Sequence, residues 1–307
     1  MLFTAYGGWN DAGSAATRAI EYLVEHLAAT KFATIDPDRY YDFTQARPHT
    51  RPVGEFMREL TWPANNFFYA APTTGSDVVL FVGTEPHLRW MRYGKAIVSL
   101  AQQVGVTESV SLGALLADTP HTRPVPLSGG SSTPDLGGKL QAIGIRSSKY
   151  EGPTGILSVV GTLLGEAGIS NGSVWASVPH YISATPNPTA AAALVRQLNA
   201  VYMLDVPLGA LDVESGAFQS QVETALADNP EAQQYVRQLE LTSPPTDIQS
   251  YLTPRDSELD RPPGNGDSEP LDESQAEGLI ASVEEFLRRR QREHQEDAST
   301  DDEDPRD

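Results

Sequence analysis

Polar and charged side chains follow four of the strands that the sequence predicts, at the point where each strand ends. The first strand (2–6) and a buried strand (77–83) are each followed by an acidic residue, and two later strands end in histidines. Together these loops contribute Trp9, Asp11, Glu85, Asp118, His121, Arg123 and His180. Ligands of parallel α/β sheets usually lie outside the carboxyl ends of the strands. These seven residues are therefore the candidate ligand-binding residues.

These residues would lie at the rim of the sheet, the edge where its strands end, and they include groups that could transfer protons to or from a bound ligand. The candidate catalytic residues are Asp11, Glu85, His121 and His180, since histidine and carboxylates are common general acids and bases. Arg123 would bind a phosphate, because its planar guanidinium forms paired hydrogen bonds, and Asp11 or Glu85 would hold a sugar hydroxyl. This interpretation predicts an enzyme of the nucleoside phosphorylase or hydrolase type. A ligand sensor that uses the same residues without catalysis is a further alternative.

Each candidate also has a structural interpretation. Asp11 opens a predicted helix, where its carboxylate would accept backbone N–H groups, and we favour this capping role. Trp9 is expected to pack against a neighbouring side chain, and His121 and His180 to form structural hydrogen bonds. Side chains that converge on an open pocket would favour a ligand site. Side chains that cap helices or bind backbone would favour a protein-binding module.

The sequence lacks the usual signatures of nucleotide, metal and thiol sites. GGWNDAGSAAT (7–17) has neither the Gly-Lys-Ser/Thr ending nor the Gly-x-Gly-x-x-Gly spacing of phosphate-binding loops, and it predicts a tight turn from strand to helix. The Gly/Ser run 128–132 could bind an anion through backbone amides, but we favour a turn. No His-x-x-x-His spacing indicates a metal, and the chain has no cysteine. We expect neither a metal nor a cofactor.

Strand and helix patterns alternate through the first two-thirds of the chain. Strands are predicted at 2–6, 32–36, 77–83, 109–118 and 173–181, and helices at 11–27, 87–105, 133–144, 153–168 and 187–204. The segment 54–71 is typical of a hairpin, with turn residues at 63–66. Strand–helix alternation predicts a three-layer α/β/α fold whose mostly parallel sheet is covered on both faces.

The charge of the chain is concentrated near its C-terminus. The 307 residues carry a net charge of −19; residues 1–211 hold 14 basic and 16 acidic side chains, and residues 212–307 hold 8 and 25. Neither part has a basic stripe, so no nucleic-acid partner is expected. The sequence contains no apolar run of the ~18 residues that a membrane span needs. We expect a cytoplasmic protein without membrane contact, and leave open whether the native start lies upstream of Met1.

The composition divides the chain into five regions. We predict an α/β core (1–211), a helical extension (212–242), a flexible linker (243–272), an amphipathic helix (273–296) and a disordered acidic tail (297–307). The apolar stripe of that helix comprises Leu279, Ile280, Val283, Phe286 and Leu287. Because an isolated helix of this length is marginal in water, we expect it to dock on the protein's own assembly.

Five strings resemble, in the same order, the bacterial branch of the proteasome assembly chaperone 2 family. They are GWNDAGSAAT (8–17), YYDFTQARP (40–48), LGALLADTPHTRPVP (112–126), YEGPTGILSVV (150–160) and WASVPHYISATPNPTAAAALV (175–195). The resemblance covers about residues 3–240. It implies an α/β/α fold similar to nucleoside phosphorylases, self-association that is commonly trimeric, and a proteasome-related protein partner. Archaeal members can dock through a C-terminal hydrophobic-tyrosine-x tail, whereas this sequence ends in EDPRD.

These observations favour an oligomeric cytoplasmic protein-binding module without established catalysis. We expect a homo-oligomer, most simply a trimer, formed through the α/β core. The alternative is a nucleoside phosphorylase- or hydrolase-like enzyme, or a small-ligand-binding protein, that uses the rim of the sheet.

Overall fold

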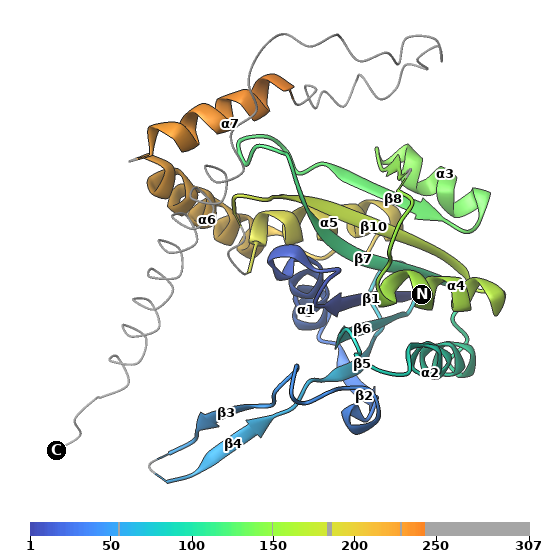
Figure 1. Cartoon of the computed structure of the whole chain (residues 1–307). Coiled ribbons are helices and arrows are strands. Elements are labelled where there is room, and N and C mark those ends of the chain that lie inside the picture. The colour runs from blue at the N-terminus through green and yellow to red at the C-terminus, as the bar shows by residue number, and fades with distance from the viewer. Residues whose placement is uncertain (55, 149, 183–185, 228, 243–307) are drawn as a thin grey trace.

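The computed structural model describes residues 1–54, 56–148, 150–182, 186–227 and 229–242 (Figure 1). The predicted linker 243–272, the amphipathic helix 273–296 with its apolar stripe, and the acidic tail 297–307 lie outside the described residues. Within the described ranges, no helix combines the length and apolar character that crossing a membrane requires.

An eight-stranded mixed sheet forms the centre of the fold. In spatial order its strands are β2 (Thr30–Thr34), β5 (Asn65–Ala70), β6 (Val78–Thr84), β1 (Leu2–Gly7), β7 (Glu108–Ala117), β10 (Ser170–Pro179), β8 (Leu127–Ser131) and β9 (Arg146–Ser147). The four strands β6, β1, β7 and β10 are parallel, as predicted. Both flanks contain antiparallel pairs: β2 with β5, β5 with β6, and β8 with β10.

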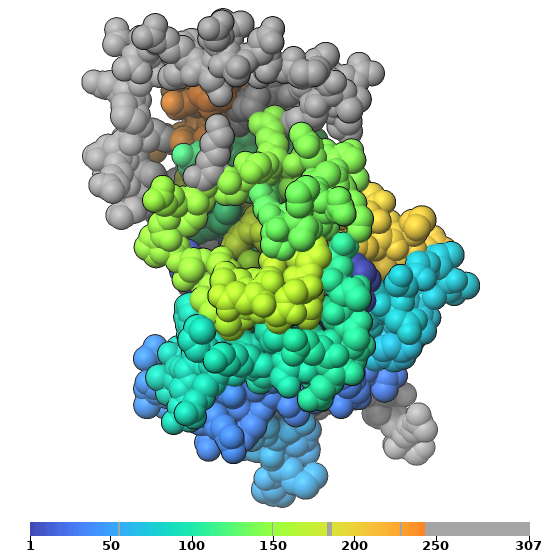
Figure 2. Space-filling model, turned by 90° about the vertical axis from the view of Figure 1, so that its right-hand side faces the viewer, coloured from blue at the N-terminus to red at the C-terminus, as the bar shows by residue number. Residues whose placement is uncertain are grey.

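Helices cover both faces of this sheet and complete the predicted three layers (Figure 1). One face packs against α1 (Ala15–His26), α3 (Pro134–Ala142) and α5 (Pro188–Tyr202). The other packs against α2 (Trp90–Gln103) and α4 (Ile156–Glu166), the side shown in Figure 2. The helix α6 (Gly209–Ala227) lies on α5, and α7 (Pro230–Thr242) packs on α6. Helix α6 begins at Gly209 and continues past residue 211, where the sequence predicts that the α/β core ends. That domain boundary stays a prediction.

The central strands are apolar because both of their faces are buried. Along β1, Phe3 and Ala5 belong to the core cluster beneath α1 and α5, whereas Leu2 and Tyr6 belong to the cluster beneath α2 and α4. Successive side chains of a strand point to opposite faces, so a strand covered on both sides reads as a continuous apolar run.

The predicted hairpin at 54–71 is wrong. Its two halves belong to different sheets: β4 (Arg58–Thr61) pairs with β3 (His49–Pro52), whereas β5 pairs with β2 and β6. Pro63 lies between β4 and β5, and a proline cannot donate a hydrogen bond to a strand ladder. The pair β3–β4 forms a separate two-stranded ribbon that projects from the body (Figure 1).

The turn predicted at 128–132 is also wrong, because residues 127–131 form β8. The strand passes so close to β10 that a β-carbon on Gly129 would overlap the carbonyl oxygen of Ser173. Glycine is therefore required at this position. Glycine-rich segments have low strand propensity, which hides the strand in the sequence.

Both edges of the eight-stranded sheet are short or irregular. The outermost strand on one side, β9, has two residues, and the outermost strand on the other side, β2, has a register shift between Lys31 and Ala33.

We expect Phe81→Ala to lower the free energy of unfolding by about 3–5 kcal/mol, because it leaves a cavity in a close-packed core. Phe81 is fully buried, and its ring lies 4.6 Å from that of Phe67 and 5.3 Å from that of Tyr6. Phe32→Ala, at a half-exposed position, is the matched control and should cost less than about 1 kcal/mol. Denaturant unfolding at fixed protein concentration measures both. Equal losses for the two variants would contradict the assigned core.

Candidate functional site

The seven candidate residues lie where the central strands end, but they form two groups. Trp9, Asp11 and Glu85 follow β1 and β6; Asp118, His121, Arg123 and His180 follow β7 and β10. Among the described residues, no side-chain hydrogen bond or ion pair joins the first group to the second. The two groups therefore have to be considered separately.

Asp11 caps the N-terminus of α1. One carboxylate oxygen accepts the backbone N–H groups of Ala16 (2.7 Å) and Thr17 (3.3 Å), and the other accepts the Thr17 hydroxyl (2.5 Å). The first N–H groups of a helix have no partner within the helix, and the carboxylate supplies one. The predicted capping role is confirmed. Burial raises the pKa of Asp11, and the hydrogen bonds from Thr17 and Ala16 oppose that shift without reversing it.

Glu85 performs the same task for α4. Its Oε1 accepts the backbone N–H of Ile156, the first residue of that helix (2.8 Å), and the side-chain amide of Asn10 (3.0 Å). The loop after β1 reaches Glu85 because Gly8 has φ +127°, a conformation that other residues rarely adopt. Asn10 is buried and was not among the candidates, although it directly precedes Asp11. Asn10 links the two capping carboxylates, because its side chain binds Glu85 and its backbone is followed directly by Asp11.

Trp9 is largely exposed. The residue is 64% exposed, so neighbouring residues cover only the smaller part of its surface, and the predicted packing role stays a prediction. The backbone beside it pairs with β7, since Ala114 donates its N–H to the Asn10 carbonyl (2.8 Å). The two residues after Ala114, Leu115 and Leu116, are also exposed. Leu115 and Leu116 are consecutive in β7 and so point to opposite faces of the sheet edge. We call the three exposed apolar residues of this edge, Trp9, Leu115 and Leu116, the rim patch.

The second group is an aromatic and imidazole cluster. His121 Nδ1 lies 2.8 Å from the hydroxyl of Tyr181, which also accepts the His121 backbone N–H (2.8 Å). His180 Nε2 lies 3.3 Å from the hydroxyl of Tyr235 on α7. The two histidines thus have the structural hydrogen bonds that the sequence predicts. Burial lowers the pKa of His121 although Glu223 and Glu240 oppose the shift, so burial favours the neutral imidazole.

His180 and Asp118 approach each other without forming a hydrogen bond. The Nδ1 atom lies 3.2 Å from Asp118 Oδ1, but it is buried and lacks hydrogen-bond geometry. The contact is therefore an ion pair only when the imidazole is protonated.

The loop after β7 fastens α7 to the body. Thr122 donates its hydroxyl to Glu240 Oε1 (2.5 Å), and Arg123 Nη2 donates to the Glu240 carbonyl (3.2 Å). Tyr181 follows directly after a candidate histidine and could have been found from the sequence. Tyr235 and Glu240 lie on a helix more than 100 residues beyond the loop at 118–123, and nothing in their local pattern indicates this contact.

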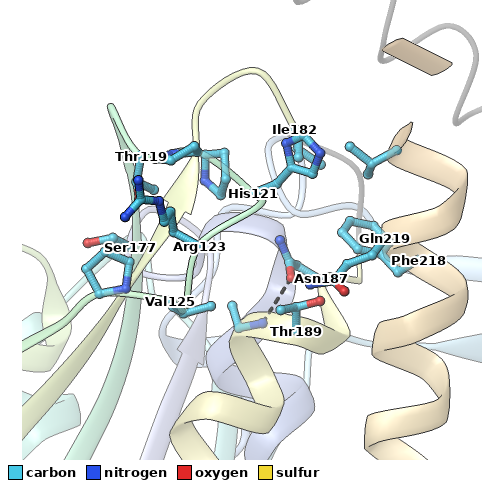
Figure 3. Close-up of a pocket in the computed structure, with 15 residues that line it drawn as sticks. Thr119, His121, Arg123, Val125, Ser177, Ile182, Asn187, Thr189, Phe218 and Gln219 are labelled. Atoms are coloured by element: carbon cyan, nitrogen blue, oxygen red, sulfur yellow. Dashed lines mark hydrogen bonds between the residues drawn. The ribbon is translucent and has the colours of Figure 1, made fainter. Parts of the chain in front are cut away.

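A small pocket with a cavity volume of about 20 Å³ lies between this loop, the N-terminus of α5 and α6 (Figure 3). Of the seven candidates, only His121 and Arg123 line it. The wall opposite them includes Asn187, whose side chain caps α5 by accepting the Ala190 N–H (3.0 Å, the dashed line in Figure 3). The hydroxyl of Thr189, also in the lining, is buried and has no hydrogen-bond partner.

The described part of the chain shows no group of three or more His, Asp or Glu side chains arranged to hold a metal ion. The chemistry available at the pocket is therefore that of a guanidinium, an imidazole and hydroxyl groups.

Comparisons with known proteins place the chain in one family. The model described as PAC2 family matches residues 5–226. A PAC2 family protein from Streptomyces avermitilis is 39% identical, with a TM-score of 0.69 over 76% of this chain and 98% of its own. A proteasome-assembly chaperone homologue from Mycobacterium tuberculosis is also 39% identical, with a TM-score of 0.69 over 76% and 99%.

More distant solved structures share the fold. An archaeal proteasome activator from Pyrococcus furiosus is 16% identical, with a TM-score of 0.58 over 73% of this chain and 92% of its own. No curated protein matches the chain. Because the family model spans most of the chain and two solved relatives are matched over almost their whole length, this chain belongs to the PAC2 family.

Proposed function

We propose that this protein is a chaperone-like, non-catalytic module that binds a proteasome-related protein in the cytoplasm and acts as a homo-oligomer, most simply a trimer. The proposal is supported by the relative from M. tuberculosis, which is described as a proteasome-assembly chaperone homologue and is 39% identical over nearly its whole length. Soluble homo-oligomers usually close into symmetric rings or dimers, which is consistent with a trimer.

The observation that carries the proposal is the use of the rim carboxylates as helix caps. A general base needs an atom that is free to accept a proton from a substrate. Both oxygens of Asp11 and one oxygen of Glu85 already accept hydrogen bonds from the chain. Neither residue lines the pocket beside His121 and Arg123. The two acids are therefore poorly placed to act on a ligand there.

The rim patch is the surface that best fits a protein partner. A tryptophan and two leucines are each exposed at the end of the central strands, and the loop that carries Trp9 is tied to Glu85 by the hydrogen bond of Asn10. Exposed apolar groups of this kind mark interaction sites, and tryptophan is enriched at the centres of protein interfaces.

The double substitution Trp9→Ala with Leu116→Ser should weaken binding to purified proteasome subunits of the source organism by about tenfold or more, because it removes the aromatic anchor of the interface. Surface plasmon resonance with the separate subunits measures this. Val213→Ser, at an exposed position on α6, is the matched control and should bind as the unaltered protein does. If the unaltered protein binds no proteasome subunit at tens of micromolar, the proposed partner is wrong.

A structural role for Asp11 also predicts a particular dependence on pH. Burial raises its pKa above the ordinary 3.8, so between that value and the raised one the folded protein holds more protons than the unfolded chain. The contribution of Asp11 to stability is therefore full at low pH and falls as pH rises through this window. In Asp11→Asn this part of the pH dependence should vanish. Urea unfolding of both proteins across pH 3.5–7 tests this, and parallel curves would contradict the assigned burial.

A small anionic ligand in the pocket is the second candidate function, favoured by one specific observation. Arg123 and His121 line the same cavity as the buried, unpartnered Thr189 hydroxyl, and such a hydroxyl can donate to a phosphate or carboxylate oxygen. Arg123 makes one hydrogen bond to a carbonyl oxygen and no ion pair among the described residues, so its charge is available.

If this second function is correct, phosphate or a nucleoside at millimolar concentration should raise the melting temperature of the protein. Arg123→Ala should abolish the shift, because the cation that holds the anion is lost. Thr122→Val is the matched control, since it removes a neighbouring contact to Glu240 and keeps the charge. Differential scanning fluorimetry is sufficient, and a flat response to the whole panel would leave the pocket without a ligand role.

A further inference from the structure

The ribbon β3–β4 and the loop that joins its strands carry a group of exposed apolar side chains. We call residues 47–62 the arm. Phe56 at its tip is 89% exposed, Met57 is 69% exposed and Leu60 is 50% exposed. We propose that the arm packs against a second copy of this chain and is a principal contact that joins copies. This inference rests on the self-association included in the proposed function and identifies the surface that carries it.

The two faces of the arm differ in polarity. Residues that face each other across an antiparallel pair share a face. On one face Arg51 forms an ion pair with Glu59, with 2.8 Å between Nε and Oε2. On the other face Thr50 pairs with Leu60 and Pro52 pairs with Arg58. This face therefore combines apolar side chains with one positive charge, and all of its strand residues are exposed in the described chain.

The arm also lacks support from its own chain. All residues of both strands are exposed. Among the described residues, the one ring contact of the arm is that of Trp62 at its root with Phe43 (4.8 Å between centroids). A two-stranded hairpin is at best marginally stable in water unless it packs against another element. A ribbon whose apolar side chains are uncovered in one copy would therefore be stabilised by a covering surface from elsewhere.

Charge favours a second copy as that surface. The arm holds three arginines and two glutamates, in a chain whose net charge is −19. Arg47 and Arg58 make no ion pair among the described residues. Residues 212–242, which form most of α6 and α7, hold six acidic side chains and one arginine. The arm thus has a net charge of +1 and residues 212–242 a net charge of −5, so the arm of one copy is attracted to the α6–α7 end of another.

The positions of these segments prevent the arm from meeting the acidic helices of its own copy. The arm and the α6–α7 pair lie at opposite ends of the molecule (Figures 1 and 2). A contact between the arm of one copy and the acidic end of the next would be head-to-tail. Contacts of that kind generate closed rings when the rotation between copies allows closure.

Light scattering coupled to size-exclusion chromatography tests the proposal on the full chain. The unaltered protein, at tens of micromolar, should have a mass above the 33.2 kDa of one copy. The double variant Phe56→Ser with Leu60→Ser should dissociate at a protein concentration at least about tenfold higher than the unaltered protein does. Val104→Ser, at a half-exposed position away from the arm, should leave the mass unchanged. Circular dichroism checks that each variant is folded.

Hydrogen exchange supplies a second, independent readout. Backbone amides of residues 49–61 should be protected in the oligomer and lose that protection on dilution to single copies. If the double variant keeps the oligomeric mass, the arm contact is wrong while self-association stands. If the unaltered protein is a single copy at every concentration, self-association and the arm contact both fall, and partner binding at the rim patch is untouched. If these amides stay protected in single copies, another segment of the same chain covers the arm, and the proposal is wrong.

Discussion

The N-termini of two helices, one on each side of the sheet, end on carboxylates that come from the same edge. Asp11 holds α1 on one face and Glu85 holds α4 on the other, and Asn10 connects the two through one loop. A helix N-terminus carries unpaired N–H donors and a partial positive charge. A carboxylate placed there accepts hydrogen bonds from the donors and is attracted by the charge. The layers are thereby fixed relative to the central strands at the edge where the rim patch and the pocket lie.

Much of this fold could be predicted because its signals are local. The apolar runs of β1 and β6 and the helical spacing of Ala16, Ile20 and Leu23 follow from burial on one or both faces, which a sequence displays directly. The Asp11 cap was likewise predictable, since cap and helix adjoin. Residues 127–131 were missed because β8 depends on close contact with β10, and the pairing of β4 with β3 depends on a partner that only the fold identifies.

In the candidate site, too, some features follow from local sequence and others depend on contacts that only the fold creates. Position at a strand end correctly indicated which loops meet at the rim, because strand direction fixes that edge. It did not indicate that the seven residues divide into two groups, nor that α7 returns to supply Tyr235 and Glu240. Those contacts join residues more than 50 positions apart, and no periodicity encodes them. The PAC2 fold therefore brings the candidate residues to one edge of the sheet, while tertiary contacts decide the role of each side chain.

The short and irregular edges of the eight-stranded sheet bear on solubility. An open strand edge has unpaired N–H and C=O groups that can template pairing with another molecule, and long flat edges promote uncontrolled aggregation. Here one edge has only two residues, in β9, and the other is interrupted at Lys31–Ala33 with a lysine beside the break. Continuous growth of the sheet from molecule to molecule is therefore disfavoured. A protein with such edges can expose apolar side chains for recognition elsewhere on its surface without converting every encounter into a fibre.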